Sequence, residues 1–230
     1  MSFRRISLTI GIACLACAAH AQQPVPRPPA PSLSEPKGAA RPVDARGFIH
    51  RWLVLEPVAV PGRLTEPAVE EALRSAPLPG QPDALPRDGE ELALAGTNVK
   101  WHALDTLNYN VNLYHFAWAL SKPTSNVLFW VTTTVDSPQE MKDVRLSIGS
   151  NAASRWWLNG QPVIALNDDR QAVIDDGVSK RLTLRKGRNV IRAAIVNGGG
   201  ATDFCARFLD ANDRPVTGLS TSLSEHPAIR

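Results

Sequence analysis

The sequence contains little cysteine, and what it has cannot cross-link a fold. Two of the three cysteines, Cys14 and Cys17, lie within an amino-terminal leader described below. Cys205 then stands alone, so no internal disulfide can form in the rest of the chain. We expect Cys205 to be a buried structural thiol and the fold to be held by its hydrophobic core.

The chain also has no large excess of positive or negative side chains. The chain has 25 Lys and Arg residues against 22 Asp and Glu, for a formal net charge of +3, and loss of Arg4 and Arg5 with the leader would lower it by two. A near-neutral surface gives no electrostatic basis for binding nucleic acid or an anionic membrane. We therefore expect no nucleic-acid partner.

Recognisable catalytic motifs are absent as well. The sequence has no Gly-x-Ser-x-Gly nucleophile elbow, and its histidines have no carboxylate partner at a meaningful spacing. We interpret each histidine after the leader as a surface or sheet residue rather than as a base. They are His50, His102, His115 and His226. The sequence favours a non-catalytic protein, although a triad assembled only in three dimensions would escape this reasoning.

No metal or cofactor site is indicated. The acidic pairs Asp168-Asp169 and Asp175-Asp176 flank Arg170, but they lack the ligand spacing of an EF-hand loop. Solvated turn residues are the favoured interpretation, with a structural calcium ion left open. Zinc would require more Cys and His ligands than the chain offers.

The first 21 residues have the three parts of a secretory signal. Arg4 and Arg5 supply the positive region, residues 6–18 the apolar stretch, and residues 19–21 a small-x-small cleavage site. The apolar stretch is shorter than the roughly 20 residues that span a bilayer, so no membrane-spanning segment is predicted. We expect a periplasmic or extracellular protein cleaved near Ala21, with twin-arginine export or lipidation at Cys17 as alternatives.

Three segments follow the leader. Residues 22–46 are rich in proline and nearly free of large apolar side chains, which predicts a disordered tether. Residues 47–222 suffice for one domain, and residues 223–230 form a short tail.

Short apolar strands dominate the predicted domain. They are bounded by turn residues and have no helical periods between them from residue 99 onward, which is typical of a sandwich or jelly roll. One helix is expected over residues 67–74, where Pro67 suits the first turn. The fold class is an all-β, jelly-roll-like sandwich with one short helix. The predicted strands are residues 52–58, 99–106, 114–120, 126–135, 143–150, 154–158, 162–166, 172–175, 179–184, 189–196 and 203–209.

Several short motifs lie in the second half of the domain. They comprise Gly149-Ser150, Trp157-Leu158-Asn159-Gly160, residues 182–190 and Asp203-Phe204, together with an opening strand Trp52-Leu53-Val54-Leu55-Glu56-Pro57. Asn159-Gly160 is the residue pair of a type I′ hairpin turn. Residues 186–189 predict a second turn, after which Leu182 and Leu184 would pair with Val190 and Ile191.

This set of motifs resembles the galactose-binding-like jelly-roll modules related to the sugar-binding domains of β-galactosidase-type glycoside hydrolases. The resemblance implies association with carbohydrate, as in accessory modules of polysaccharide-degrading enzymes such as acetylxylan esterases. One departure is that Asn151-Ala152-Ala153 stands where relatives usually have Asp-Asp-Gly. This loss of acidic groups puts in doubt a cation or sugar contact at that loop.

The tryptophans are the most informative aromatic residues. Trp52, Trp118 and Trp130 lie in apolar segments and are expected in the core. Adjacent strand residues point to opposite faces, so Trp156 and Trp157 cannot enter the same core. We assign Trp156 to the core; Trp157 either packs under a covering loop or presents its ring to a ligand.

A polar segment before residue 114 is the second candidate contact surface. Its asparagines and tyrosines suit hydroxyl-rich ligands and equally suit turns in a long connection. The candidate ligand-binding residues from both regions are Arg155, Trp157, Asn159, Arg170, Asn108, Tyr109 and Asn110.

The leading functional hypothesis is an exported, non-catalytic module that binds polysaccharide or oligosaccharide and assists polysaccharide processing. An envelope assembly module that binds another protein is the alternative. An esterase of the acetylxylan type is the third hypothesis, which the missing nucleophile elbow disfavours.

Overall fold

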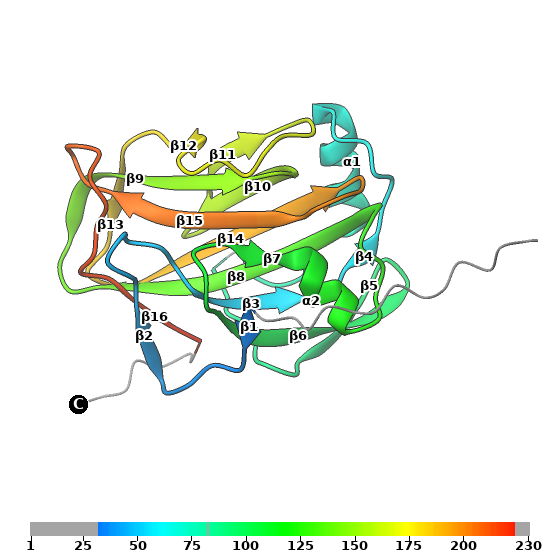
Figure 1. Ribbon diagram of the computed structural model, residues 1–230, viewed down its shortest axis with the longest axis horizontal. Helices are drawn as coiled ribbons and strands as arrows, with labels where there is room; N and C mark the ends of the chain where they lie inside the picture. Colours follow the sequence, from blue (N-terminus) through cyan, green and yellow to red (C-terminus); the bar gives the residue numbers. More distant parts are fainter. Residues whose placement is uncertain (1–31, 82, 224–230) are drawn as a thin grey trace, which may run out of the picture.

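The chain forms two β-sheets that pack face to face as a sandwich (Figure 1). The computed structural model describes residues 32–81 and 83–223. The predicted leader at 1–21, residues 22–31 of the predicted tether and residues 224–230 of the predicted tail lie outside them.

The larger sheet has eleven strands within the described residues and is antiparallel throughout its pairings. Its long central strands β8 and β14 pair over their whole length, from Val127↔Asn197 to Ser137↔Gly187. The main path runs through β1 (Leu33–Ser34), β6 (Thr97–Thr106), β3 (Arg51–Leu55), β8 (Val127–Ser137), β14 (Gly187–Asn197), β10 (Ala153–Leu158) and β11 (Gln161–Leu166). Off this path, β4 (Val58–Ala59) and β16 (Ser220–Ser222) pair with other stretches of β8, β2 (Ala40–Pro42) pairs with β16, and β5 (Glu91–Leu94) pairs with β6.

The smaller sheet has five strands among the described residues, in the order β12-β9-β15-β7, with β13 also on β9. Their bounds are β7 (Val111–Asn112), β9 (Met141–Ser150), β12 (Gly177–Val178), β13 (Leu182–Leu184) and β15 (Asp203–Leu209). Gly149 on β9 is needed because a Cβ there would lie 2.3 Å from the carbonyl oxygen of Val173, in the loop that crosses this sheet.

The main core fills the space between the two sheets. Trp52 and Trp156 from the larger sheet meet Phe204 from the smaller one, with ring centroids 4.9 and 5.5 Å apart and steep interplanar angles. All three side chains are fully buried. Such edge-to-face packing adds to the apolar area that they remove from water.

A second core covers the outer face of the larger sheet. Helix α1 (Glu66–Ser75) and the proline-rich segment after it pack there against Leu53, Trp101 and Trp130. The larger sheet therefore buries both faces, which is why β8 is buried along nearly its whole length rather than at alternate residues.

Most of the predicted strands are confirmed, as is the helix, which extends from Glu66 to Ser75. Asn159 and Gly160 have φ of 50° and 80°, as the predicted I′ turn requires. Trp52, Trp130 and Trp156 are buried, and Cys205 is buried with 2% exposure.

The strand predicted over residues 114–120 is wrong. This segment forms a second helix, α2 (Leu113–Ala119). The side chain of Asn112 accepts a hydrogen bond from the His115 amide at 2.7 Å and so caps the helix. Leu113, Phe116 and Ala117 enter the main core at helical spacing. Trp118 consequently lies on a helix and is only half buried.

Two further strand predictions are wrong. Residues 172–175 form a loop. Leu182 and Leu184 pair with Val144 and Met141 on β9, not with β14. The turn at 185–189 instead carries the chain from the smaller sheet to the larger one.

The predicted disorder of the tether is wrong for its second half. Leu33–Ser34 pairs with β6 and Ala40–Pro42 pairs with β16, so the domain begins before residue 47. Backbone pairing and buried arginine contacts order this segment, although it has few large apolar side chains. In the described ranges, no helix has the length and apolar character to cross a membrane.

Candidate functional site

A surface pocket of about 370 Å³ lies beside helix α2. Its lining comes from the start of the helix and from the turn that precedes β15. The lining residues are Asn112, Tyr114, His115, Gly200 and Ala201. The sequence segment that suited hydroxyl-rich ligands thus reaches a pocket, although at its carboxyl-terminal end.

Main-chain contacts fix the two sides of this pocket relative to each other. The amides of Leu113 and Tyr114 donate to the carbonyl oxygen of Thr202 at 2.8 and 3.4 Å. Asn112 is opposite Asp203 in the β7–β15 ladder. Gly200 has a φ of 77°, a conformation that suits glycine and lets the turn close against α2.

Three aromatic rings gather on the exposed side of α2. The ring centroid of Tyr114 lies 6.0 Å from that of His115 and 6.1 Å from that of Trp118, and the His115–Trp118 separation is 6.4 Å. All three side chains are half buried, so each ring keeps part of its surface accessible.

Asp203 is not part of the pocket lining but lies opposite the lining residue Asn112 in the β7–β15 ladder. Burial raises the pKa of this carboxyl above its usual value, opposed by the charge of His115 and by a hydrogen bond from Asn110. That hydrogen bond is long, at 3.4 Å. A carboxylate with such weak internal pairing retains capacity to accept hydrogen bonds from a ligand.

The other predicted residues of this segment lie elsewhere. The Tyr109 ring packs 5.1 Å from Phe48, under the guanidinium of Arg46 at 5.3 Å. The Asn108 carbonyl accepts a hydrogen bond from Thr106. Only Asn110 remains close to the pocket, through its contact with Asp203.

The four predicted residues of the second region have contacts within the protein. Arg155 is 7% exposed and binds Glu70 of α1 at 2.7 Å and the Leu166 carbonyl at 2.9 Å. Trp157 is half buried and packs in the second core, 5.8 Å from Trp130. It also lines a shallow pocket of about 250 Å³ with β11. Packing inside the protein therefore covers most of the Trp157 surface, which agrees with the first of its two predicted roles.

The side chains of Asn159 and Arg170 stabilise a turn and a loop, respectively. Asn159 accepts from the Val190 amide at 2.9 Å and donates to Asn189 at 3.0 Å. Arg170 is paired with Asp176. The structure does not gather the seven predicted residues into one pocket lining.

The pair Asp175-Asp176 is more engaged than solvated turn residues would be, whereas Asp168 and Asp169 are exposed, as predicted. Asp175 accepts hydrogen bonds from Ser147 and Arg207, linking the 170–176 loop to the smaller sheet. Burial tends to raise the pKa of Asp175, but these hydrogen bonds and the Arg207 charge lower it overall. No cluster of three potential metal ligands occurs in the described part of the chain.

The expectation that the histidines lack carboxylate partners is wrong for two of them. His102 lies 3.1 Å from Glu56, and His50 lies 3.1 Å from Asp44 through Nε2 and 3.2 Å from the Thr106 hydroxyl through Nδ1. Thr106 is fully buried and its hydroxyl donates to the Asn108 carbonyl at 2.8 Å. This hydroxyl is therefore inaccessible to a substrate, and the arrangement ties residues 44–50 to β6.

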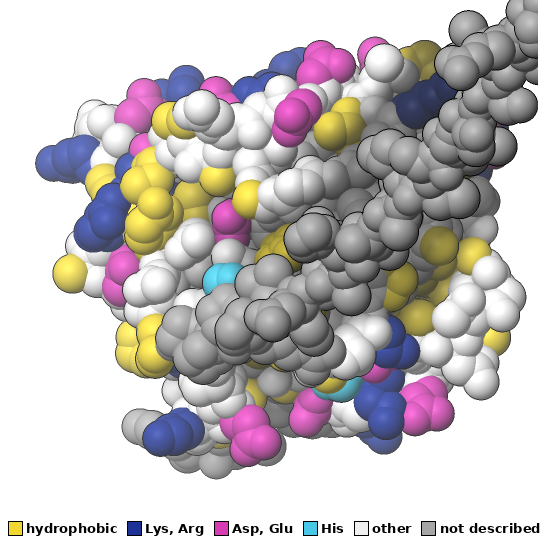
Figure 2. Space-filling model, turned by 45° about the vertical axis from the view of Figure 1, so that its right-hand side comes forward, with side chains coloured by type: hydrophobic (Ala, Val, Ile, Leu, Met, Phe, Trp, Pro, Cys, Tyr) yellow, Lys and Arg dark blue, Asp and Glu magenta, His cyan; other side chains and the backbone are white. Residues whose placement is uncertain are grey.

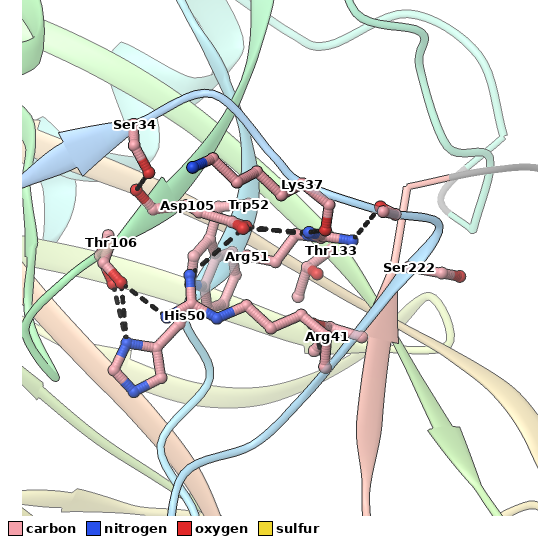
Figure 3. Close-up of polar contacts among 12 residues, drawn as sticks. Ser34, Lys37, Arg41, His50, Arg51, Trp52, Asp105, Thr106, Thr133 and Ser222 are labelled. Atoms are coloured by element: carbon pink, nitrogen blue, oxygen red, sulfur yellow. Dashed lines mark hydrogen bonds and ion pairs between the residues drawn. The ribbon is translucent and has the colours of Figure 1, made fainter.

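A buried polar cluster next to His50 has the same anchoring role (Figure 3). Arg51, 1% exposed, holds Asp105 with two hydrogen bonds of 2.8 and 3.0 Å. Its other donors reach the carbonyls of Lys37 and Gly38 at 2.8 and 2.9 Å. Arg41 adds a second cation 3.3 Å from Asp105. Arg51 and Gly38 of this cluster line a polar pocket of about 580 Å³, but the Arg51 guanidinium is already engaged by Asp105 and the two carbonyls.

Acidic and basic side chains are interspersed on the face shown in Figure 2, with no field of one sign. This distribution agrees with the near-neutral composition.

Sequence patterns did not mark His115 as a pocket residue or Asp203 as a neighbour of the pocket. The signal for His115 was helical spacing of apolar residues 113, 116 and 117, which turns residues 114, 115 and 118 outward together. Asp203 offered no sequence signal, because only the β7–β15 pairing brings it to the helix.

No family model matches the chain, and no curated protein matches it. Solved structures with a similar fold include the PA14 sugar-binding domain from an RTX adhesin, at 13% identity and a TM-score of 0.43, covering 73% of this chain and 94% of that one. The PA14 domain of the MpAFP antifreeze protein has 10% identity and a TM-score of 0.39, covering 72% of this chain and 90% of that one.

A β-glucosidase from Kluyveromyces marxianus, solved with glucose, is similar at 20% identity and a TM-score of 0.38 over 69% of this chain. This chain spans only 15% of the length of that enzyme. These neighbours include the kinds of protein that the sequence motifs resemble. Their TM-scores are low, so the similarity assigns neither a family nor a ligand to this chain.

Proposed function

We propose that this chain is an exported carbohydrate-binding module that contacts sugar through the pocket beside α2. The observation that carries the proposal is the pair of half-buried rings in one pocket lining, Tyr114 and His115, with an under-bonded carboxylate next to that lining. Sugar rings pack their C–H faces on aromatic side chains, and their hydroxyls require hydrogen-bonding groups at the edge.

Each group has a defined role in this proposal. Tyr114 and His115 form the stacking surface, with Trp118 supporting their orientation. Asp203 accepts hydrogen bonds from two sugar hydroxyls, and Asn112 keeps the helix start in place through its cap. The interspersed surface charge favours a neutral polysaccharide.

The role is non-catalytic and accessory to polysaccharide processing. Among the described residues, the hydroxyl–histidine–carboxylate arrangement at Thr106, His50 and Asp44 has a fully buried hydroxyl that already donates to a main-chain carbonyl. Export follows from the predicted leader at residues 1–21 and is part of the proposal.

Isothermal titration against a panel of neutral plant and bacterial polysaccharides tests this function. We expect saturable heat with at least one of them and a loss of affinity of about tenfold or more in Tyr114→Ala, because a central stacking ring contributes at least about 1.4 kcal/mol. Tyr109→Ala is the matched control, since this exposed tyrosine packs against Arg46 and Phe48 instead.

Asp203→Asn separates binding from stability. Because burial raises the pKa of Asp203, the ionised carboxylate costs the folded state stability at neutral pH, and the neutral amide removes that cost. We expect an unchanged or higher Tm with weaker sugar binding. Absence of heat with every polysaccharide, or equal losses in Tyr109→Ala and Tyr114→Ala, would contradict the proposed site.

A further inference from the structure

Arg192 on β14 is a buried cation whose charge is not neutralised by an ion pair in the described part of the chain. Its side chain is only 7% exposed. Nη2 donates to the main-chain carbonyls of Gln81 and Ala84 at 3.1 and 3.0 Å. Nε is buried and has no hydrogen-bond partner among the described residues. This residue is separate from the α2 pocket and has no role in the proposed sugar contact.

Burying a guanidinium in this way is costly. A charged group removed from water requires an opposite charge or a full set of hydrogen bonds to offset its lost solvation. Burial lowers the pKa of Arg192, and Asp83 opposes this only through its charge at a distance. The two carbonyl oxygens accept both hydrogen bonds of Nη2, so the remaining donors of the guanidinium are on Nε and Nη1.

The side chain lines a pocket of about 260 Å³ on the outer face of the larger sheet. Residues 78–80 and 84–86 line the pocket together with Glu90 and Leu92, beside the second core. Its walls are mainly apolar, and they include Leu85, Leu92 and Trp101 together with two prolines. The pocket therefore combines one buried cation with a surface suited to a ring or a branched aliphatic group.

We propose that this pocket binds a small carboxylate with an apolar body, of about the size of benzoate. Because Nη2 is occupied by the two carbonyls and Nε is buried, a carboxylate oxygen would accept a hydrogen bond from Nη1 and provide the negative charge that Arg192 lacks. The apolar body would displace water from Leu85 and Trp101. A neutral sugar would leave the cation unpaired and present hydroxyls to apolar walls.

Glu90 is the acidic residue in the lining and opposes this ligand. Its side chain is exposed and accepts a hydrogen bond from the Arg87 amide at 2.9 Å. Solvent screens an exposed charge more strongly than a buried one, so Arg192 outweighs Glu90 inside the pocket. Removal of the Glu90 charge should strengthen the binding of an anion.

Titration of the purified protein with benzoate and with its neutral isostere benzamide tests the proposal. We expect benzoate to bind saturably and at least about tenfold more tightly than benzamide, as a charge-assisted hydrogen bond requires. Arg192→Met should remove this preference, and Glu90→Gln should increase benzoate affinity. Arg185→Gln is the control, because Arg185 lines the neighbouring pocket with Asn159 and leaves this one unchanged.

Arg192→Met also removes the two contacts to the 81–84 main chain and could lower stability. Its Tm is therefore measured beside the titration, and Glu90→Gln decides the outcome if that variant unfolds. Equal binding of benzoate and benzamide, no saturable binding of either, or a loss of binding in Arg185→Gln would overturn the proposal. None of these outcomes bears on sugar binding at α2.

Discussion

At the scale of single residues, Asn189 organises the crossing between the sheets. Its amide nitrogen donates to the carbonyls of Arg185 and Gly187 at 2.9 and 3.1 Å, and its oxygen accepts from the Arg185 amide at 3.0 Å. Asn159 donates to the same oxygen at 3.0 Å. One fully buried side chain thus holds a turn and the Asn159-Gly160 hairpin together, which gives these sequence motifs a structural purpose.

Thr202 is the opposite case, a fully buried residue whose hydroxyl finds no hydrogen-bond partner in the described residues. An unsatisfied buried hydroxyl costs stability, whereas valine has nearly the same shape without the polar group. We expect Thr202→Val to increase the free energy of unfolding by about 1 kcal/mol in urea denaturation.

Thr132→Val is the matched control for this substitution. The Thr132 hydroxyl is also fully buried but donates to the Ile191 carbonyl at 2.9 Å. Removing the Thr132 hydroxyl takes one hydrogen bond away from the Ile191 carbonyl oxygen. We therefore expect the free energy of unfolding to fall by about 1 kcal/mol. Destabilisation by both substitutions would indicate that the Thr202 hydroxyl is satisfied after all.

At the scale of elements, the segment carrying β1 and β2 is attached mainly by polar contacts. Arg51 and Asp105 on adjacent strands β3 and β6 form the centre, and main-chain carbonyls of residues 37 and 38 complete the shell (Figure 3). This segment has few large apolar side chains. It is ordered because its main-chain carbonyls accept hydrogen bonds from the buried Arg51 guanidinium.

Removing the carboxylate tests this attachment. Asp105→Ala leaves the buried Arg51 charge without its partner, so we expect a loss of about 3–5 kcal/mol in the free energy of unfolding. Glu91→Ala is the control: it breaks the solvent-exposed pair with Lys100 and should leave the free energy of unfolding nearly unchanged. Equal small losses would contradict a central role for Asp105.

The cost of Asp105→Ala should also depend on pH. Burial tends to raise the pKa of Asp105, but the hydrogen bonds and charges of Arg51 and Arg41 lower it overall. A lowered folded-state pKa means that the carboxylate stabilises the fold above the unfolded-state value of about 3.9, and that this contribution is lost as pH falls through the folded-state pKa. The two proteins should therefore converge in stability in strong acid.

The strands were largely predictable from the sequence, whereas the site was not. Alternating apolar residues in segments such as residues 143–150 report directly on a buried face. Helix α2 was misread because its aromatic residues also favour strands, and only the Asn112 cap and main-core contacts decide the matter. Residues such as Asp203 enter the site through long-range pairing, which local patterns do not encode.

The adjacent tryptophans show where the whole molecule departs from a simple sandwich. Alternation predicted that Trp156 and Trp157 point to opposite faces, and they do. Because α1 and the proline-rich segment form a second core, Trp157 finds packing partners on the face that a two-layer sandwich would expose. The number of layers depends on how distant segments fold over the sheet, which single strands do not reveal.

Both cores share the larger sheet, so we expect the domain to unfold as one unit. Cys205 reports on this because it lies on β15 of the smaller sheet and burial raises its thiol pKa to about 11. In a Cys14→Ser, Cys17→Ser background at pH 8, a thiol reagent should label Cys205 only as the fold opens. The labelling midpoint in urea should coincide with that of tryptophan fluorescence, which reports mainly on the larger sheet. Labelling well below that midpoint would show that the smaller sheet opens first and that the shared sheet does not couple the two cores.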